Sequence, residues 1–80
     1  MSTFEIKVEP LAVEATVTND VLRVVLADGR ELAVPLAWFP RLRDATPDQR
    51  MRWELIGGGI GIHWPEIDED ISVESLLAIR

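Results

Sequence analysis

The residues best able to carry chemistry lie together between residues 57 and 71. This stretch holds the only histidine, His63, with four of the five glycines and the densest run of carboxylates. An imidazole titrates near neutral pH, so His63 is the one candidate for general acid–base work. Neither Ser72 nor Ser75 lies in the strained strand-to-helix turn that exposes a nucleophilic serine. We therefore expect no catalytic residue and no enzymatic activity.

The glycines of this stretch invite comparison with a phosphate-binding loop. Such a loop follows a strand, contains Lys-Ser or Lys-Thr and opens a helix, so that backbone N–H groups face the phosphate. Here the glycines follow a predicted helix, precede a predicted strand and include no lysine. They are typical of a helix end followed by a turn, and we expect no cofactor.

Four carboxylates follow His63 within seven residues, at Glu66, Asp68, Glu69 and Asp70. Carboxylates and an imidazole can bind divalent cations, but a calcium loop requires a glycine in its turn and a glutamate at its twelfth position. The segment has neither. We expect a solvated acidic loop rather than a metal site.

The remaining candidates are residue types that are favoured at protein interfaces. Trp and Arg are enriched among the residues that dominate binding energy, although in a small domain core filling is the more frequent role of a tryptophan. A tryptophan margin between arginines and an acidic loop would form a protein-binding surface. The predicted partner-binding residues are Trp38, Arg41, Arg50, His63, Trp64, Glu66, Asp68, Glu69 and Asp70.

The composition limits the class of partner. The 80 residues carry a net charge of −6 and a pI near 4.6. Because phosphate neutralisation dominates nucleic-acid affinity, we expect no direct nucleic-acid binding by this domain. An acidic surface instead favours a basic protein partner.

Targeting features and cysteines are absent from the sequence. No apolar run approaches the roughly 20 residues needed to cross a bilayer. The N-terminus lacks the basic and apolar regions of a signal peptide. With no cysteine, these features predict a cytoplasmic protein that does not associate with membranes.

Alternation of apolar and polar residues predicts the first strands. Residues 1–11 alternate as far as Pro10 and indicate an extended arm or an extra strand. Residues 12–17 predict a strand with Val13, Ala15 and Val17 on one face. Asn19-Asp20 is a plausible tight turn after it, because both side chains tolerate left-handed backbone conformations.

The next strands complete an antiparallel meander. Residues 21–27 are apolar on both faces, which indicates a central strand. Asp28-Gly29 predicts a type I′ hairpin turn. Residues 30–35 predict a third strand that ends, or lies at an edge, at Pro35.

The second half of the chain predicts helices and a short strand. The apolar block at residues 36–42 indicates an irregular or 3₁₀ turn that lays Trp38 and Phe39 across the sheet. Thr46, Pro47 and Gln49 form a capping box that opens a helix, expected to run to Ile56 and stop at Gly57. A strand over residues 61–64 and a helix over residues 73–79, capped by Ser72, complete the chain.

These elements predict a single α+β domain over residues 1–80. Its expected architecture is a three-stranded antiparallel meander plus one or two further short strands. Two short helices are expected to pack on one face of the sheet.

Several strings in this order resemble the small bacterial DUF2442 family, over roughly residues 13–78. They are Asp28-Gly29-Arg30, Val34-Pro35-Leu36-Ala37-Trp38-Phe39-Pro40-Arg41-Leu42, Ala45-Thr46, Gln49-Arg50, Gly61-Ile62-His63-Trp64-Pro65, Asp68-Glu69-Asp70-Ile71-Ser72-Val73 and Leu76-Leu77. The family often closes with a glycine, where this chain has Leu77-Ala78-Ile79-Arg80.

The resemblance implies a limited set of functional expectations. Such proteins are largely uncharacterised, and many are encoded beside a small DUF4160 protein in an arrangement like a toxin–antitoxin pair. Some relatives carry a helix-turn-helix domain, and this sequence shows none.

The sequence thus favours a non-enzymatic protein-interaction domain. The leading hypothesis is an acidic, antitoxin-like protein that binds a small basic DUF4160-like partner. The alternative is a regulatory domain that senses a small molecule or ion through the Gly57–Asp70 loop. Self-association through exposed strand edges stays open.

Overall fold

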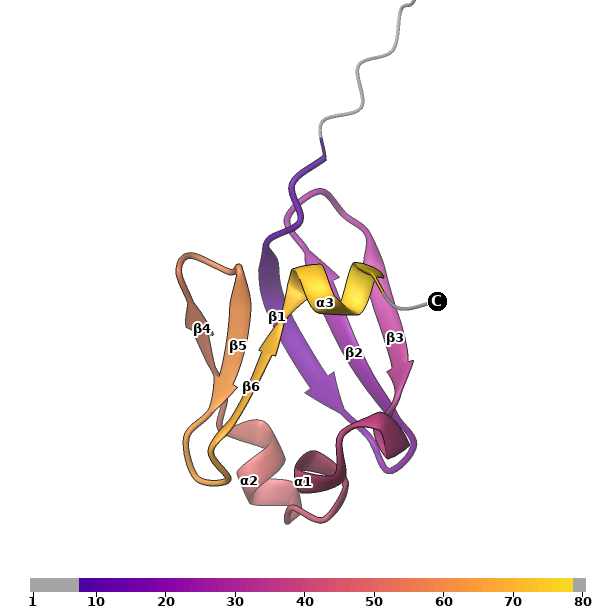
Figure 1. The fold of residues 1–80 in the computed structure, drawn as a ribbon, viewed down its shortest axis with the longest axis vertical. Helices are drawn as coiled ribbons and strands as arrows, with labels where there is room; N and C mark the ends of the chain where they lie inside the picture. The colour runs from indigo at the N-terminus through magenta and orange to yellow at the C-terminus, as the bar shows by residue number, and fades with distance from the viewer. Residues whose placement is uncertain (1–7, 79–80) are drawn as a thin grey trace, which may run out of the picture.

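The chain folds into two three-stranded antiparallel sheets joined and closed by short helices (Figure 1). The computed structural model describes residues 8–78. Sheet A has the order β1-β2-β3, and sheet B has the order β4-β5-β6. The elements are β1 (Ala12–Val17), β2 (Val21–Leu26), β3 (Glu31–Pro35), the 3₁₀ turn η1 (Leu36–Trp38), α1 (Pro40–Arg43), α2 (Pro47–Met51), β4 (Glu54–Ile56), β5 (Gly61–Trp64), β6 (Glu69–Ser72) and α3 (Val73–Ala78). The predicted α+β class with an antiparallel meander is confirmed.

Sheet A has the predicted topology, with β2 in the centre and β3 ending at Pro35. The β1–β2 turn is closed by Thr18, whose Oγ1 accepts hydrogen bonds from the N–H groups of Asp20 (3.2 Å) and Val21 (3.0 Å). The expected turn position is therefore right. The left-handed conformation offered as its reason is wrong, since Asp68 is the one non-glycine residue with positive φ among the described residues.

The Asp28-Gly29 turn also lies where it was predicted, but with a different geometry. Only Gly29 has a positive φ (92°). Its N–H donates to the Leu26 carbonyl (3.0 Å), and the Leu26 N–H donates to the Arg30 carbonyl (2.8 Å). This is a three-residue loop with a G1 bulge rather than a type I′ turn. The Arg30 side chain, through its hydrogen bond, lowers the pKa of Asp28 to about 2.

A β-bulge in β1 corrects the predicted face of that strand at Val13. Ala12 pairs with Leu26 and Glu14 pairs with Val25, so Val13 is an extra residue between them. A bulge changes which side chains point inward. Ala15 is buried and Val17 packs against the core, as their shared face predicts, whereas Ala12 replaces Val13 on the core side and Val13 is 50% exposed.

The N-terminal approach to β1 carries no strand at residues 8–11, and the rest of the expected arm, residues 1–7, lies outside the described residues. The Glu9 N–H donates to Asp28 Oδ2 (2.9 Å), and the Leu11 carbonyl accepts from the Ala27 N–H (2.8 Å). These bonds fix the approach against the β2–β3 turn.

The segment between the sheets begins as predicted and then departs from the prediction. The capping box at Thr46 and Gln49 is present, with Pro47 as the first helical residue. However, α2 ends at Met51, and the predicted helical residues 54–56 form β4. Arg52, with φ −99° and ψ 79°, leaves the helical region and starts the change of direction.

The glycine-rich segment is a hairpin turn rather than a helix end. It joins β4 to β5, and the Gly59 N–H donates to the Ile56 carbonyl (3.0 Å). The Gly59 carbonyl accepts from the Ala12 N–H (2.7 Å), and the Ile60 carbonyl accepts from the Val73 N–H (3.0 Å). The turn therefore ties sheet B to β1 and to the start of α3.

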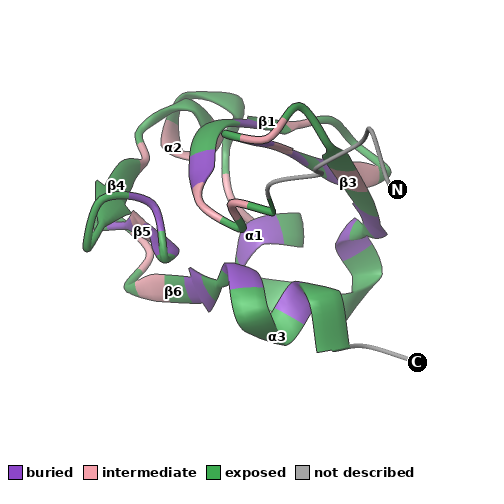
Figure 2. Cartoon of the chain, turned by 90° about the horizontal axis from the view of Figure 1, so that it is seen from above, coloured by how far each residue is buried: buried purple, intermediate pink, exposed green. Residues whose placement is uncertain are grey.

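The two sheets and the helices enclose one core (Figure 2). Sheet A contributes alternate residues of β2, sheet B contributes its inner face, and α3 adds two side chains. The buried residues are Ala12, Ala15, Leu22, Val24, Leu26, Val34, Leu36, Leu42, Ile62, Trp64, Ile71, Val73 and Leu76. Ser72 caps α3 as predicted, since its Oγ accepts from the Ser75 N–H (3.1 Å).

Candidate functional site

Three residues form a row across the outer face of sheet B. The strand register places Glu54 of β4 and Asp70 of β6 on either side of His63 in β5. Directly opposed residues of antiparallel strands point to the same face. Their neighbours Ile62 and Ile71 are buried, so this row faces away from the core. We call Glu54, His63 and Asp70 the His63 row.

His63 is held in the row by its carboxylate neighbours. Its Nδ1 lies in direct contact with Asp70 Oδ1, as a hydrogen-bonded ion pair when the imidazole is protonated. This hydrogen bond, with the charges of Asp70, Glu54 and Asp68, raises the pKa of His63 against the opposing effect of desolvation. The arrangement stabilises an imidazolium on the surface.

Within residues 8–78, the side chains of Ser72 and Ser75 are hydrogen-bonded to each other's backbone and not to His63. Ser72 Oγ accepts from the Ser75 N–H (3.1 Å), and Ser75 Oγ donates to the Ser72 carbonyl (2.8 Å). Among the described side chains, no group of three or more His, Cys, Asp or Glu residues is arranged to hold a metal ion. Within this part of the chain, the row therefore supplies charge and hydrogen bonds on an open face.

Two arginines fix the acidic turn between β5 and β6. Arg41 Nη1 donates to the Asp68 carbonyl (2.7 Å), and Arg52 Nη1 contacts Glu66 Oε2 (2.6 Å). Asp68 has a φ of 51°, a left-handed conformation that is uncommon outside glycine. The predicted acidic loop is thus a fixed turn, and its last residues, Glu69 and Asp70, belong to β6.

Arg50 has a structural role in the fold. Its guanidinium donates to the carbonyls of Leu42 (3.0 Å) and Arg43 (2.6 Å) and to Asn19 Oδ1 (3.2 Å). These contacts bind α1, α2 and the β1–β2 turn together. Glu54, which the predicted helix would have placed one turn after Arg50, lies in β4 instead.

The tryptophans are divided between core and surface. Trp64 is fully buried, and its indole N–H donates to the Arg50 carbonyl (3.1 Å), so its side chain is not accessible to a partner. Trp53 is half-buried and packs against the core. Trp38 is 50% exposed at η1, after β3, and is not laid across the sheet as was expected.

The predicted site residues are therefore brought together only in part. His63 and Asp70 share the row, and Asp68 acts on His63 through its charge. Glu69 precedes Asp70 in β6. Arg41 and Glu66 lie at the adjacent turn. Trp38 lies in η1, directly after β3 of sheet A, whereas the His63 row lies on sheet B.

The apolar part of this surface was not among the predicted site residues. Ile56 is 39% exposed and Ile60 is 57% exposed. With Gly61 they line a shallow hollow of about 170 Å³, the Gly61 hollow, beside the His63 row. Ile56 was expected at the end of a helix, and Ile60 was not among the candidates. Glu54 and Ile56 are two residues apart and would share one face of a strand. That spacing was the signal that could have placed Ile56 on this surface.

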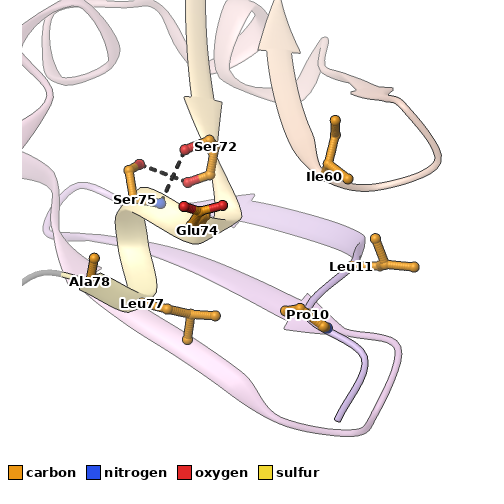
Figure 3. A pocket seen from close by; sticks show the side chains of 8 residues that line it. All are labelled: Pro10, Leu11, Ile60, Ser72, Glu74, Ser75, Leu77 and Ala78. Carbon is orange, nitrogen blue, oxygen red and sulfur yellow. Dashed lines mark hydrogen bonds between the residues drawn. The ribbon is translucent and has the colours of Figure 1, made fainter.

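A larger groove of about 520 Å³ lies next to the Gly61 hollow (Figure 3). We call it the α3 groove. Figure 3 shows Leu77 and Ala78 of α3 on one side and Pro10 and Leu11 on the other. Ile60 and Ser72 lie at the end nearest sheet B, and Glu74 and Ser75 complete the described lining.

In the part of the chain that the structure describes, no helix is long and apolar enough to cross a membrane.

Comparisons with known proteins identify the family but not an activity. A search of curated proteins gives no match. The fold is similar to the crystal structure of a protein of unknown function from Rhodospirillum rubrum ATCC 11170, with 31% sequence identity and a TM-score of 0.71. That match covers 85% of this chain and 84% of the other. The family described as "Protein of unknown function (DUF2442)" matches residues 12–80, as the resemblance predicted, and the chain belongs to this family.

Proposed function

We propose that this chain is a non-enzymatic protein-interaction domain that binds a basic protein through the outer face of sheet B. In this proposal it is the acidic, antitoxin-like partner of a small basic DUF4160-like protein. One observation carries the proposal: the outer face of sheet B places exposed isoleucines beside carboxylates that point to solvent.

The charge of this face supports a basic partner. Glu54 has no ion-pair partner among the described residues, and Asp70 pairs only with His63. The whole chain carries a net charge of −6. Complementary charge accelerates encounter and excludes partners of like charge. A partner surface rich in Lys or Arg would meet this face favourably.

The Gly61 hollow alone is smaller than most small-molecule sites, although the adjoining α3 groove, at about 520 Å³, is not. The hollow beside the His63 row measures about 170 Å³. Small-molecule sites usually enclose about 300–1,000 Å³. Exposed apolar side chains rimmed by polar groups are instead typical of protein interfaces.

Co-expression with the product of the neighbouring gene, followed by size-exclusion chromatography, tests the proposal. We expect the two proteins to elute together at micromolar concentration. Independent elution of two folded proteins at that concentration would refute the proposed partnership.

A matched pair of charge reversals locates the interface. Glu54→Lys places a positive charge on the outer face of sheet B, whereas Glu14→Lys makes the same change on β1 of sheet A. Both glutamates are exposed and lie in edge strands. Because like charges at an interface cost up to several kcal/mol, Glu54→Lys should weaken the complex at least about tenfold. Glu14→Lys should change it little, and equal effects would place the interface elsewhere.

A further inference from the structure

The α3 groove and the Gly61 hollow form one continuous surface. Ile60 and Ser72 line both of them. Ile60 therefore stands as a ridge between two depressions, and it is the more exposed of the two isoleucines at the glycine turn. A segment that crosses this ridge contacts both depressions at once.

The two ends of this surface differ in chemistry. The α3 groove is apolar along both sides, with Leu11 facing Leu77, which is 40% exposed. Its volume of about 520 Å³ is large enough to accept more than one side chain. The Gly61 hollow instead borders the His63 row, since Asp70 belongs to both.

Spacing in the sheet relates the hollow to the charges. Glu54 and Ile56 are two residues apart on β4, and so are His63 and Gly61 on β5. Residues two apart in a strand lie about 7 Å from each other on one face. A basic side chain over the row is thus about one side-chain width from an apolar side chain over Gly61.

We infer that this surface binds a segment of a basic protein that presents adjacent apolar side chains followed by a basic side chain. The apolar side chains enter the α3 groove and cross Ile60, and the basic side chain lies at the Glu54 end of the His63 row, where the carboxylate has no ion pair among residues 8–78. This inference rests on the proposed function and specifies the chemistry of the partner's contacting segment.

Charge complementarity distinguishes this occupant from a second copy of the chain. A copy would bring its own net charge of −6 to a surface that already carries Glu54, Asp70 and Glu74. Glu74 lines the α3 groove and has no ion pair among residues 8–78. Like charges at close range disfavour the pairing of two copies. A basic segment instead neutralises the negative charge of the surface.

Titration of the isotopically labelled full chain with blocked tetrapeptides tests the inference. The amide chemical shifts of the protein are measured as each peptide is added. The probe is acetyl-Leu-Leu-Ser-Lys-amide. Acetyl-Leu-Leu-Ser-Glu-amide reverses its charge, and acetyl-Ser-Ser-Ser-Lys-amide removes its apolar side chains. We expect saturable shifts at Ile60, Gly61 and Leu77 with the first peptide. The charge-reversed peptide should bind about two- to fivefold more weakly, and the peptide without leucines at least about tenfold more weakly.

Matched variants assign each end of the surface. Leu77→Ser should weaken the binding of the two peptides that contain leucine, and Val13→Ser should not, although both change an exposed aliphatic residue to serine. Glu54→Gln should weaken the Lys peptide more than the Glu peptide. Circular dichroism and thermal midpoints show whether each variant is folded, and the comparison of peptides on the unchanged chain stands without any variant.

The outcomes separate this inference from the proposed function. Equal binding of all three peptides, the absence of saturable shifts, or shifts confined to sheet A would overturn the inference. Concentration-dependent dimerisation that shifts the same amides without peptide would also overturn it, in favour of a second copy. If the peptides do not bind but a complex with the neighbouring gene product forms, the inference is refuted and the proposed function is retained. If the peptides bind as expected and that complex does not form, only the proposed partner is refuted.

Discussion

The close approach of Gly59 to β1 predicts that a single methyl group will disturb the surface described above. A Cβ at Gly59 would lie 2.5 Å from the Ala12 carbonyl oxygen and 3.0 Å from the Ala12 nitrogen. Both atoms belong to the backbone and cannot rotate away. Gly59 also has a φ of 114°, which side-chain-bearing residues rarely adopt. In Gly59→Ala, the glycine turn must therefore move away from β1.

The expected cost follows from three contributions. A non-glycine residue in a sparsely populated backbone region costs about 1–3 kcal/mol. Loss of the hydrogen bond from the Ala12 N–H to the Gly59 carbonyl (2.7 Å) adds about 1 kcal/mol. The displaced turn also loses packing against Leu11, whose Cβ would lie 3.2 Å from the new methyl group. We expect a total loss of about 3 kcal/mol in the free energy of unfolding.

Gly58→Ala is the matched control. Gly58 has a positive φ of 72°, but a Cβ there meets no atom within 4 Å. It should therefore cost only the backbone contribution, about 1–2 kcal/mol. Urea unfolding followed by tryptophan fluorescence measures both variants, and for a domain of this size each kcal/mol lowers the melting temperature by roughly 4–8 °C. Equal losses in the two variants would refute the argument that Gly59 is required by its contact with β1.

Two further predictions concern Arg50 and His63. Arg50→Met keeps the aliphatic stem but removes three hydrogen bonds to the α1 region and the β1–β2 turn, so we expect urea unfolding to show a loss of about 1–3 kcal/mol. Arg43→Met, at an arginine whose ion pair is with its neighbour in sequence, should change stability little, and a similar loss there would contradict the role given to Arg50. Because the pKa of His63 is raised in the folded state, its stabilising contribution is fully present below its ordinary value of about 6.5 and is lost as pH rises through the raised value. An NMR titration of the imidazole should give a midpoint above that value, and Asp70→Asn should lower it, whereas a wild-type midpoint below 6.5 would exclude the ion pair.

Sheet A and the helix caps could be predicted because their signals are local in sequence. The turn at Asp28-Gly29, the stop at Pro35 and the capping box at Thr46 each depend on residues within three or four positions of one another. Finer geometry was not accessible in this way. The bulge at Val13 follows from the pairing of β1 with β2, which the sequence of β1 does not encode.

The β4 strand was missed because residues 51–56 fit two periodicities. From Met51 to Leu55 apolar and polar side chains alternate, as in a strand. Met51 and Leu55 are also four residues apart, and Trp53 and Ile56 three apart, as on one face of a helix. Tertiary contacts decide between them. The Trp64 indole bonds to the Arg50 carbonyl within the last turn of α2, and β4 pairs with β5 directly after it.

The candidate surface could be predicted only where its residues lie within one short segment of the sequence. His63 and Asp70 were both candidates, and the sheet register joins them. Glu54, 16 positions before Asp70, enters the same row only because the glycine turn folds β4 onto β5. Leu11 and Leu77 come from opposite ends of the chain and face each other across the α3 groove because Gly59 and Ile60 bond to Ala12 and Val73. The glycine turn thus brings the charged and apolar parts of the surface together.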